Sequence, residues 1–176
     1  MVPGTVFWIT GLSGAGKTTV ATCLQSALLG HGIQALLLDG DHLRAAVAED
    51  LGFTPKDRLR AAMRYARVCR LLSEQGATII CPTISMFHAC RAWNRTHISQ
   101  YLEIYLKVPV SELRERDVKG LYLKHASGEL EHMVGLADEF EEPQHPDLIL
   151  SNYGETSIQG AVTAIIELYS LSGFAG

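Results

Sequence analysis

The stretch Gly11-Leu12-Ser13-Gly14-Ala15-Gly16-Lys17-Thr18 decides the fold of this chain. An apolar run at residues 5–10 precedes it, and residues 19–29 follow it with a helical apolar rhythm. A glycine, four residues and then Gly-Lys-Thr, placed between a strand and a helix, is the pattern of a phosphate-binding loop, or P-loop. Its glycines permit backbone angles at which several N–H groups converge on one anion, and the helix adds the positive end of its dipole. The stretch therefore predicts that the chain binds a nucleoside triphosphate.

Individual residues of this loop have separate expected roles. Lys17 supplies a mobile cation for the β- and γ-phosphates, which makes it a candidate catalytic residue. The hydroxyl of Thr18 can ligate Mg²⁺. The residues expected to bind the nucleotide are Gly11, Ser13, Gly14, Ala15, Gly16, Lys17, Thr18 and Thr19.

Length and composition are those of an ordinary globular protein. The chain has 176 residues, of which 47% are hydrophobic and 19% charged, and its net charge is −4. We expect one domain over residues 1–176, and the charge argues weakly against nucleic acid or acidic membranes as main partners. The apolar runs are strand-sized and no secretory signal is visible, so we expect no membrane span and a cytoplasmic location. The four cysteines lack close pairing and are expected to be core thiols: Cys23, Cys69, Cys81 and Cys90.

Strand-like and helix-like segments alternate along the chain. This pattern predicts an α/β fold in which a five-stranded, mainly parallel sheet is flanked by helices. The expected strands are residues 5–10, 35–38, 78–81, 101–106 and 147–150. One expected helix begins near Lys17, and another ends near Glu49. The other expected helices span residues 57–74, 89–99, 111–117 (capped by Ser111) and 157–170.

A long polar stretch separates the fourth and fifth expected strands. A loop of this length in a compact domain is usually a functional lid, and the alternative is a surface insertion without a role. Basic residues at its entry, Arg116, Lys119 and Lys124, favour a lid at about residues 118–146. Closure of such a lid would exclude water and bring cations to the transferred phosphate.

Asp39-Gly40-Asp41 follows the second expected strand, at the sheet edge where α/β proteins bind ligands. Two carboxylates there can hold Mg²⁺ and accept a proton from an attacking hydroxyl. Arg44 would share the helix face of Asp41 and reach an anionic acceptor. An ordinary strand-to-helix turn is the alternative, which the neighbouring P-loop makes the weaker one.

Two other residues could have either a structural or a functional role. Phe53 is either a core residue or a stacking platform, and Ser85 is either a polar contact or a turn residue. The seven histidines show no metal-ligand spacing. A P-loop alone also leaves open a GTPase, a motor ATPase or a kinase. Asp39-Gly40-Asp41 with Arg44 at the sheet edge and the long polar stretch favour a kinase with a small-molecule acceptor. The guanine-reading sequence Asn-Lys-x-Asp is absent, which argues against a GTPase.

These residues together resemble the adenylylsulfate (APS) kinase family, from about residue 6 to residue 150. The string Arg116-Asp117-Val118-Lys119-Gly120-Leu121-Tyr122 is far more specific than a P-loop. The other matching strings are Gly11–Thr18, Asp39-Gly40-Asp41 with Arg44, Leu51-Gly52-Phe53-Thr54-Pro55, Asp57-Arg58, Ile84-Ser85 and Gly128-Glu129.

The resemblance implies a P-loop kinase that uses ATP and Mg²⁺ to phosphorylate the ribose 3′-hydroxyl of adenylylsulfate. Asp41 would orient or deprotonate that hydroxyl, and would join Thr18 at the metal. Phe53 would stack on the base of this nucleotide acceptor. The other acceptor residues would be Asp39, Arg44, Arg58, Ser85, Lys119 and Leu121. A homodimer is possible for this family.

The chain departs from the family pattern on the acceptor side. Ala61 replaces an asparagine, Met63 an arginine and Met133 an aromatic residue, while Met86 replaces a proline. These changes raise an alternative, a kinase for cytidine diphosphoramidate in capsule biosynthesis. A second alternative, from another class, is a nucleotide-binding regulator without catalysis, against which the intact Lys17 argues.

Overall fold

The computed structural model describes residues 2–117, 120, 123, 127, 140–154 and 157–174. Among them, five parallel strands form one sheet in the order β2-β3-β1-β4-β5. The strands are β1 (Val6–Thr10), β2 (Ala35–Leu37), β3 (Thr78–Thr83), β4 (Tyr101–Lys107) and β5 (Leu148–Ser151). The predicted α/β fold with a parallel sheet is therefore confirmed.

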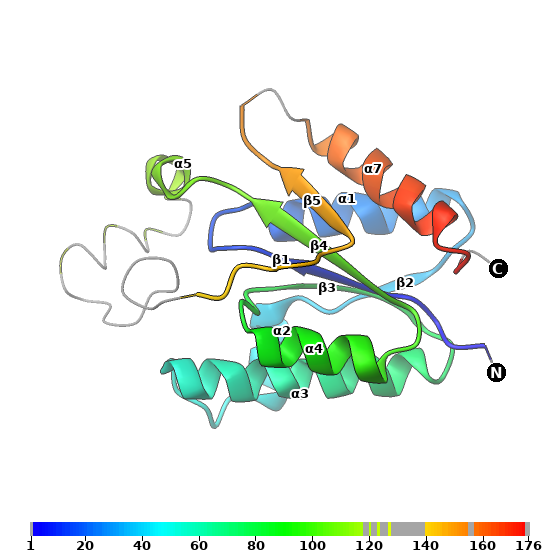
Figure 1. Cartoon of the computed structure of the whole chain (residues 1–176), viewed down its shortest axis with the longest axis horizontal. Helices are drawn as coiled ribbons and strands as arrows, with labels where there is room; N and C mark the ends of the chain where they lie inside the picture. The colour runs from blue at the N-terminus through cyan, green and yellow to red at the C-terminus, as the bar shows by residue number, and fades with distance from the viewer. Residues whose placement is uncertain are drawn as a thin grey trace.

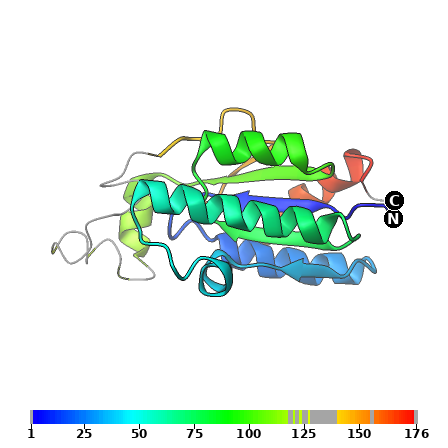
Figure 2. The ribbon, with the colours of Figure 1, turned by 90° about the horizontal axis from the view of Figure 1, so that it is seen from below.

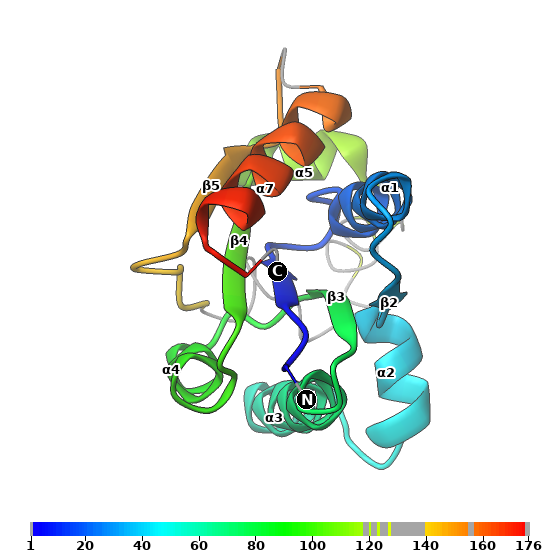
Figure 3. The ribbon, with the colours of Figure 1, turned by 90° about the vertical axis from the view of Figure 1, so that its right-hand side faces the viewer.

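Helices cover both faces of this sheet. They are α1 (Lys17–Gly30), α2 (Gly40–Val47), α3 (Pro55–Ser73), α4 (His88–His97), α5 (Val110–Arg116) and α7 (Ile158–Leu171). Helices α1 and α7 pack together on one face, and α3 and α4 lie on the other (Figures 1 and 3). The view from below shows α3 and α4 side by side, and both helices run along the strands (Figure 2).

Strand β1 is the centre of the molecule, and all five of its residues are buried. Successive side chains of a strand point to opposite faces, so this strand contributes to two cores. Phe7 and Ile9 join the core under α1 and α7, whereas Val6 and Trp8 join the core under α3 and α4. Because neighbouring strands run parallel, the P-loop leaves β1 at the same edge of the sheet at which β3 and β4 end.

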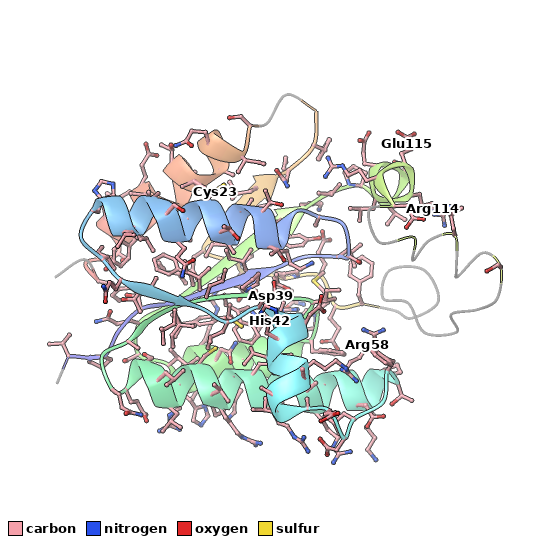
Figure 4. The ribbon with its side chains drawn as sticks, turned by 180° about the vertical axis from the view of Figure 1, so that it is seen from behind. Cys23, Asp39, His42, Arg58, Arg114 and Glu115 are labelled. Atoms are coloured by element: carbon pink, nitrogen blue, oxygen red, sulfur yellow. The ribbon has the colours of Figure 1, made fainter. Side chains whose placement is uncertain are left out.

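Two predictions on local structure are wrong. Ser111 does not cap its helix, because α5 starts one residue earlier, at Val110, and the backbone carbonyl of Pro109 accepts the first helical bond from the Leu113 N–H. Cys23 is exposed on the outer side of α1 (Figure 4), since it lies off the buried stripe of that helix. The other three cysteines are buried, as expected.

Most of the predicted lid lies outside the described residues, and so do Lys119, Leu121, Lys124 and Met133. No helix in the described part of the chain is both long and apolar enough to span a membrane. The single domain, the cytoplasmic location and the possible homodimer stay predictions.

Candidate functional site

A pocket of about 290 Å³ opens at the carboxyl edge of the sheet, between the P-loop, α2 and α3. It brings together most of the site residues predicted from the sequence: Ser13, Gly14, Gly16, Lys17, Thr18, Thr19, Asp39, Asp41, Arg44, Phe53 and Arg58. Gly11, Ala15 and Ser85 do not line this pocket. The site thus combines the predicted phosphate loop with the predicted acceptor residues in one cavity.

The P-loop has the backbone conformation that its glycines predict. Gly14 and Gly16 have φ angles of +79° and +86°, in the left-handed region that favours glycine. Helix α1 begins directly afterwards at Lys17, so its positive N-terminal end lies at the pocket. The Lys17 ammonium donates a hydrogen bond to the Leu12 carbonyl over 2.8 Å, which keeps the lysine beside the loop. The loop is therefore a preformed cationic cradle for phosphates.

Asp39 joins the phosphate loop to the start of α2 (Figure 4). As the N-cap of that helix, it accepts a hydrogen bond from the Asp41 N–H at 2.9 Å through one carboxylate oxygen. The other oxygen accepts one from the Thr18 hydroxyl at 2.8 Å. The sequence predicts Thr18 and Asp41 as metal ligands, which stays a prediction, and the structure adds a contact between the Asp39 carboxylate and Thr18. Asp41 lines the same pocket from the first turn of α2.

The oxygen atoms of Thr18 and Asp39 suit Mg²⁺, which prefers hard oxygen ligands and keeps several waters and phosphate oxygens around it. The described residues contain no cluster of three or more histidine, cysteine or carboxylate side chains that would bind a metal by themselves. This donor set fits an ion that arrives with a nucleotide better than a permanently bound metal.

Phe53 stands on the acceptor side of the pocket and is 54% exposed, so it is not a core residue. The Arg44 guanidinium lies 4.1 Å from the centroid of its ring, and that of Arg58 lies 5.4 Å away. Arg44 also donates to the carbonyls of Leu51 and Gly52, each at 2.6 Å, and Arg58 donates to the Phe53 carbonyl at 2.8 Å. An aromatic ring and two fixed cations are thus presented together, which suits an acceptor with a planar base and an anionic group.

One face of α3 forms the floor of the pocket, through Arg58, Ala61, Ala62 and Tyr65. Ala62 and Tyr65 are pocket residues that were not predicted from the sequence, although their spacing from Arg58 places them on one helical face. Burial raises the pKa of the Tyr65 hydroxyl, and the neighbouring Arg44 opposes part of that rise. Among these four floor residues, Arg58 and Tyr65 are polar and the other two are alanines.

Arg64, which follows the departure at Met63, does not line this pocket. Its guanidinium forms an ion pair with Asp50 and donates to the Val47 carbonyl at 2.9 Å. Arg64 therefore holds the end of α2 against α3, and the acceptor side relies on Arg44 and Arg58.

Strand β3 is longer than predicted at its carboxyl end. The strand continues to Thr83, two residues further than predicted, so Pro82, Thr83 and Ile84 line the pocket. Ser85 is fully buried, with its hydroxyl 3.3 Å from that of Thr83. Its predicted contact with the acceptor stays a prediction.

Comparison with known protein families agrees with this geometry. The model of the family described as adenylylsulphate kinase matches residues 3–151. The chain belongs to this family. An APS kinase of this kind is a phosphotransferase whose acceptor is a hydroxyl group, and the predicted enzyme class is confirmed.

Individual relatives support the same assignment. A probable adenylyl-sulfate kinase of Aeropyrum pernix is 41% identical over 157 residues, which cover 87% of this chain and 86% of the relative. The adenylyl-sulfate kinase of Halothermothrix orenii is 38% identical over 171 residues, covering 97% and 92%. The solved APS kinase of Mycobacterium tuberculosis, in complex with AMPPNP and APS, is 35% identical with a TM-score of 0.90, and the match covers 97% of this chain and 99% of that one. These relatives give the cytidine diphosphoramidate alternative no support over the APS kinase assignment.

Proposed function

We propose that this APS kinase transfers the γ-phosphate of MgATP to the ribose 3′-hydroxyl of adenylylsulfate. The observation that carries the proposal is the single pocket in which the phosphate loop faces Asp41, Arg44, Phe53 and Arg58. The M. tuberculosis APS kinase, with its ATP analogue and APS, supports the same pair of substrates for this chain.

Seven residues of the pocket have separate parts in the proposed reaction. Lys17 and the loop N–H groups bind the β- and γ-phosphates and stabilise the charge that develops during transfer. Thr18 and Asp39 would hold Mg²⁺, which neutralises phosphate charge when bound. The carboxylate of Asp41 orients the acceptor hydroxyl and takes its proton. Phe53 stacks on the adenine, and Arg44 and Arg58 bind the anionic sulfate and phosphate of the acceptor.

The test of the proposal is ADP release from MgATP with different acceptors at equal concentration. Adenylylsulfate is expected to give rapid turnover, because the cations and the aromatic ring of the pocket are in place. Cytidine diphosphoramidate is the competing acceptor, and a clear preference for it would overturn the proposal and assign Ala61, Met63 and Met133 to a change in specificity. ATP binding without ADP release, whatever the acceptor, would instead indicate the nucleotide-binding regulator.

A prediction on the metal follows from the contact between Asp39 and Thr18. Asp39→Asn is expected to raise the Mg²⁺ concentration needed for half-maximal activity by about tenfold, because the neutral amide is a weaker ligand for a hard cation. Titration of the activity with Mg²⁺ at fixed ATP measures this shift. Asp57→Asn is a matched control, since Asp57 lies in the first turn of α3 and does not line the pocket. An unchanged Mg²⁺ requirement for Asp39→Asn would remove Asp39 from the metal site.

A further inference from the structure

Asn152, the residue directly after β5, contacts the phosphate loop. Its side-chain Nδ2 donates a hydrogen bond to the Ala15 carbonyl over 2.7 Å. Ala15 is fully buried and Asn152 is 9% exposed. A buried carbonyl without a partner is costly, so the asparagine satisfies a polar group of the loop that is closed off from solvent.

The backbone of Asn152 is itself held on both sides. Its N–H donates to the Lys107 carbonyl at 3.2 Å, which continues the pairing of β5 with β4. Its carbonyl accepts a hydrogen bond from Arg116 at 2.9 Å, at the end of α5. The amide that reaches Ala15 therefore projects from an anchored point.

The contact sets the direction of a loop N–H group. The Ala15 carbonyl and the Gly16 N–H belong to one peptide plane, and in a trans peptide they point in opposite directions. No cis peptide bond occurs among the described residues. Because Asn152 holds the carbonyl on its own side, the Gly16 N–H points away from Asn152. In phosphate loops, the N–H groups are the atoms that bind the anion.

Gly16 lies in close contact with the same amide. A Cβ atom at this position would lie 2.6 Å from Nδ2 of Asn152. The φ angle of +86° disfavours a side chain here independently. The loop backbone and Asn152 thus fit together without room for a side chain between them.

We infer that Asn152 is a positioning residue for the donor nucleotide: its amide holds the Ala15–Gly16 peptide so that the Gly16 N–H faces the donor phosphates. Arg116, part of the motif that identified the family, supports Asn152 from α5. The inference rests on the proposed function, because it takes ATP as the ligand of the loop. Asn152 contacts the loop carbonyl and forms no hydrogen bond with the acceptor residues within the described part of the chain, so its loss should weaken donor binding and leave acceptor binding unchanged.

The test is the affinity of the purified full chain for MgATP, measured by calorimetry without any acceptor. Asn152→Asp has nearly the same shape, but its carboxylate cannot donate to the Ala15 carbonyl at neutral pH. We expect its ATP affinity to be about tenfold weaker than that of the unmodified chain. At about pH 5, a larger fraction of the introduced carboxyl is protonated and can donate again. The difference in affinity between variant and unmodified chain should therefore shrink, which a merely structural role would not produce.

Asn94→Asp is the matched control, because Asn94 is a buried asparagine of α4 whose Nδ2 donates to the Tyr101 hydroxyl at 3.3 Å. It should lower the melting temperature and leave ATP affinity unchanged. Asn152→Ala, which also lacks the donor, gives the same test if the aspartate variant does not fold. ATP affinity equal to that of the unmodified chain in a folded Asn152 variant would overturn the inference. Failure of the unmodified chain to bind ATP would overturn the proposed function and, with it, this inference.

Discussion

Lys17→Ala is expected to lower kcat/KM for phosphoryl transfer by about 10³-fold. The lysine lies at the mouth of the P-loop, where its ammonium is held by the Leu12 carbonyl beside the start of α1. Removal of this cation takes away one of the positive groups that would stabilise the charge developing on the transferred phosphate, and leaves the loop N–H groups and bound Mg²⁺. Steady-state ADP release at saturating adenylylsulfate measures the loss.

Lys56→Ala provides the control for this substitution. Lys56 is exposed in the first turn of α3 and does not line the pocket, so its removal changes the net charge equally without touching the site. We expect its activity to stay within about twofold of the unmodified chain. An activity of Lys17→Ala within tenfold of the unmodified chain would contradict the role of Lys17.

Asp41→Asn is expected to lower kcat by about 10²-fold to 10⁴-fold with little change in the KM for ATP. The substitution keeps the size of the side chain but removes the carboxylate that we propose to orient the acceptor hydroxyl and take its proton. The contact between Asp39 and Thr18 remains, so donor binding should persist. Rates at saturating concentrations of both substrates separate the effect on kcat from effects on binding.

The comparison for Asp41 is Asp50→Asn, which breaks the ion pair with Arg64 outside the pocket. Because both partners are partly or largely exposed, its effect on kcat should be small. A kcat for Asp41→Asn within threefold of the unmodified chain would show that another group accepts the proton.

Local structure that depends on residues close together in the sequence could be predicted. The P-loop between β1 and α1 is an example, because apolar periodicity, glycine positions and the start of the helix all agree there. The order of the strands could not be derived, since it depends on contacts between segments far apart in the chain. The same limit explains Asn152, which meets Ala15 only once β5 is placed beside β4.

Some details of the site depend on where elements begin and end, which the sequence does not determine closely. The spacing of Asp39 and Asp41 predicted two carboxylates at the sheet edge. Only the start of α2, with Asp39 as its cap, determines which of them faces Thr18. In the same way, the two additional residues of β3 bring Thr83 to the pocket. Tyr65 could not be assigned to the site from the sequence, because the sequence alone does not show which face of α3 meets the pocket.

The proposed phosphoryl transfer is tested most sharply by the identity of the product formed from MgATP and adenylylsulfate. Mass spectrometry and phosphorus NMR of the purified product determine whether phosphate has been added and at which hydroxyl. We expect stoichiometric ADP and adenylylsulfate that carries one new phosphate on the ribose 3′-oxygen. ADP and inorganic phosphate beside unchanged adenylylsulfate, or a phosphate on any other atom, would contradict it.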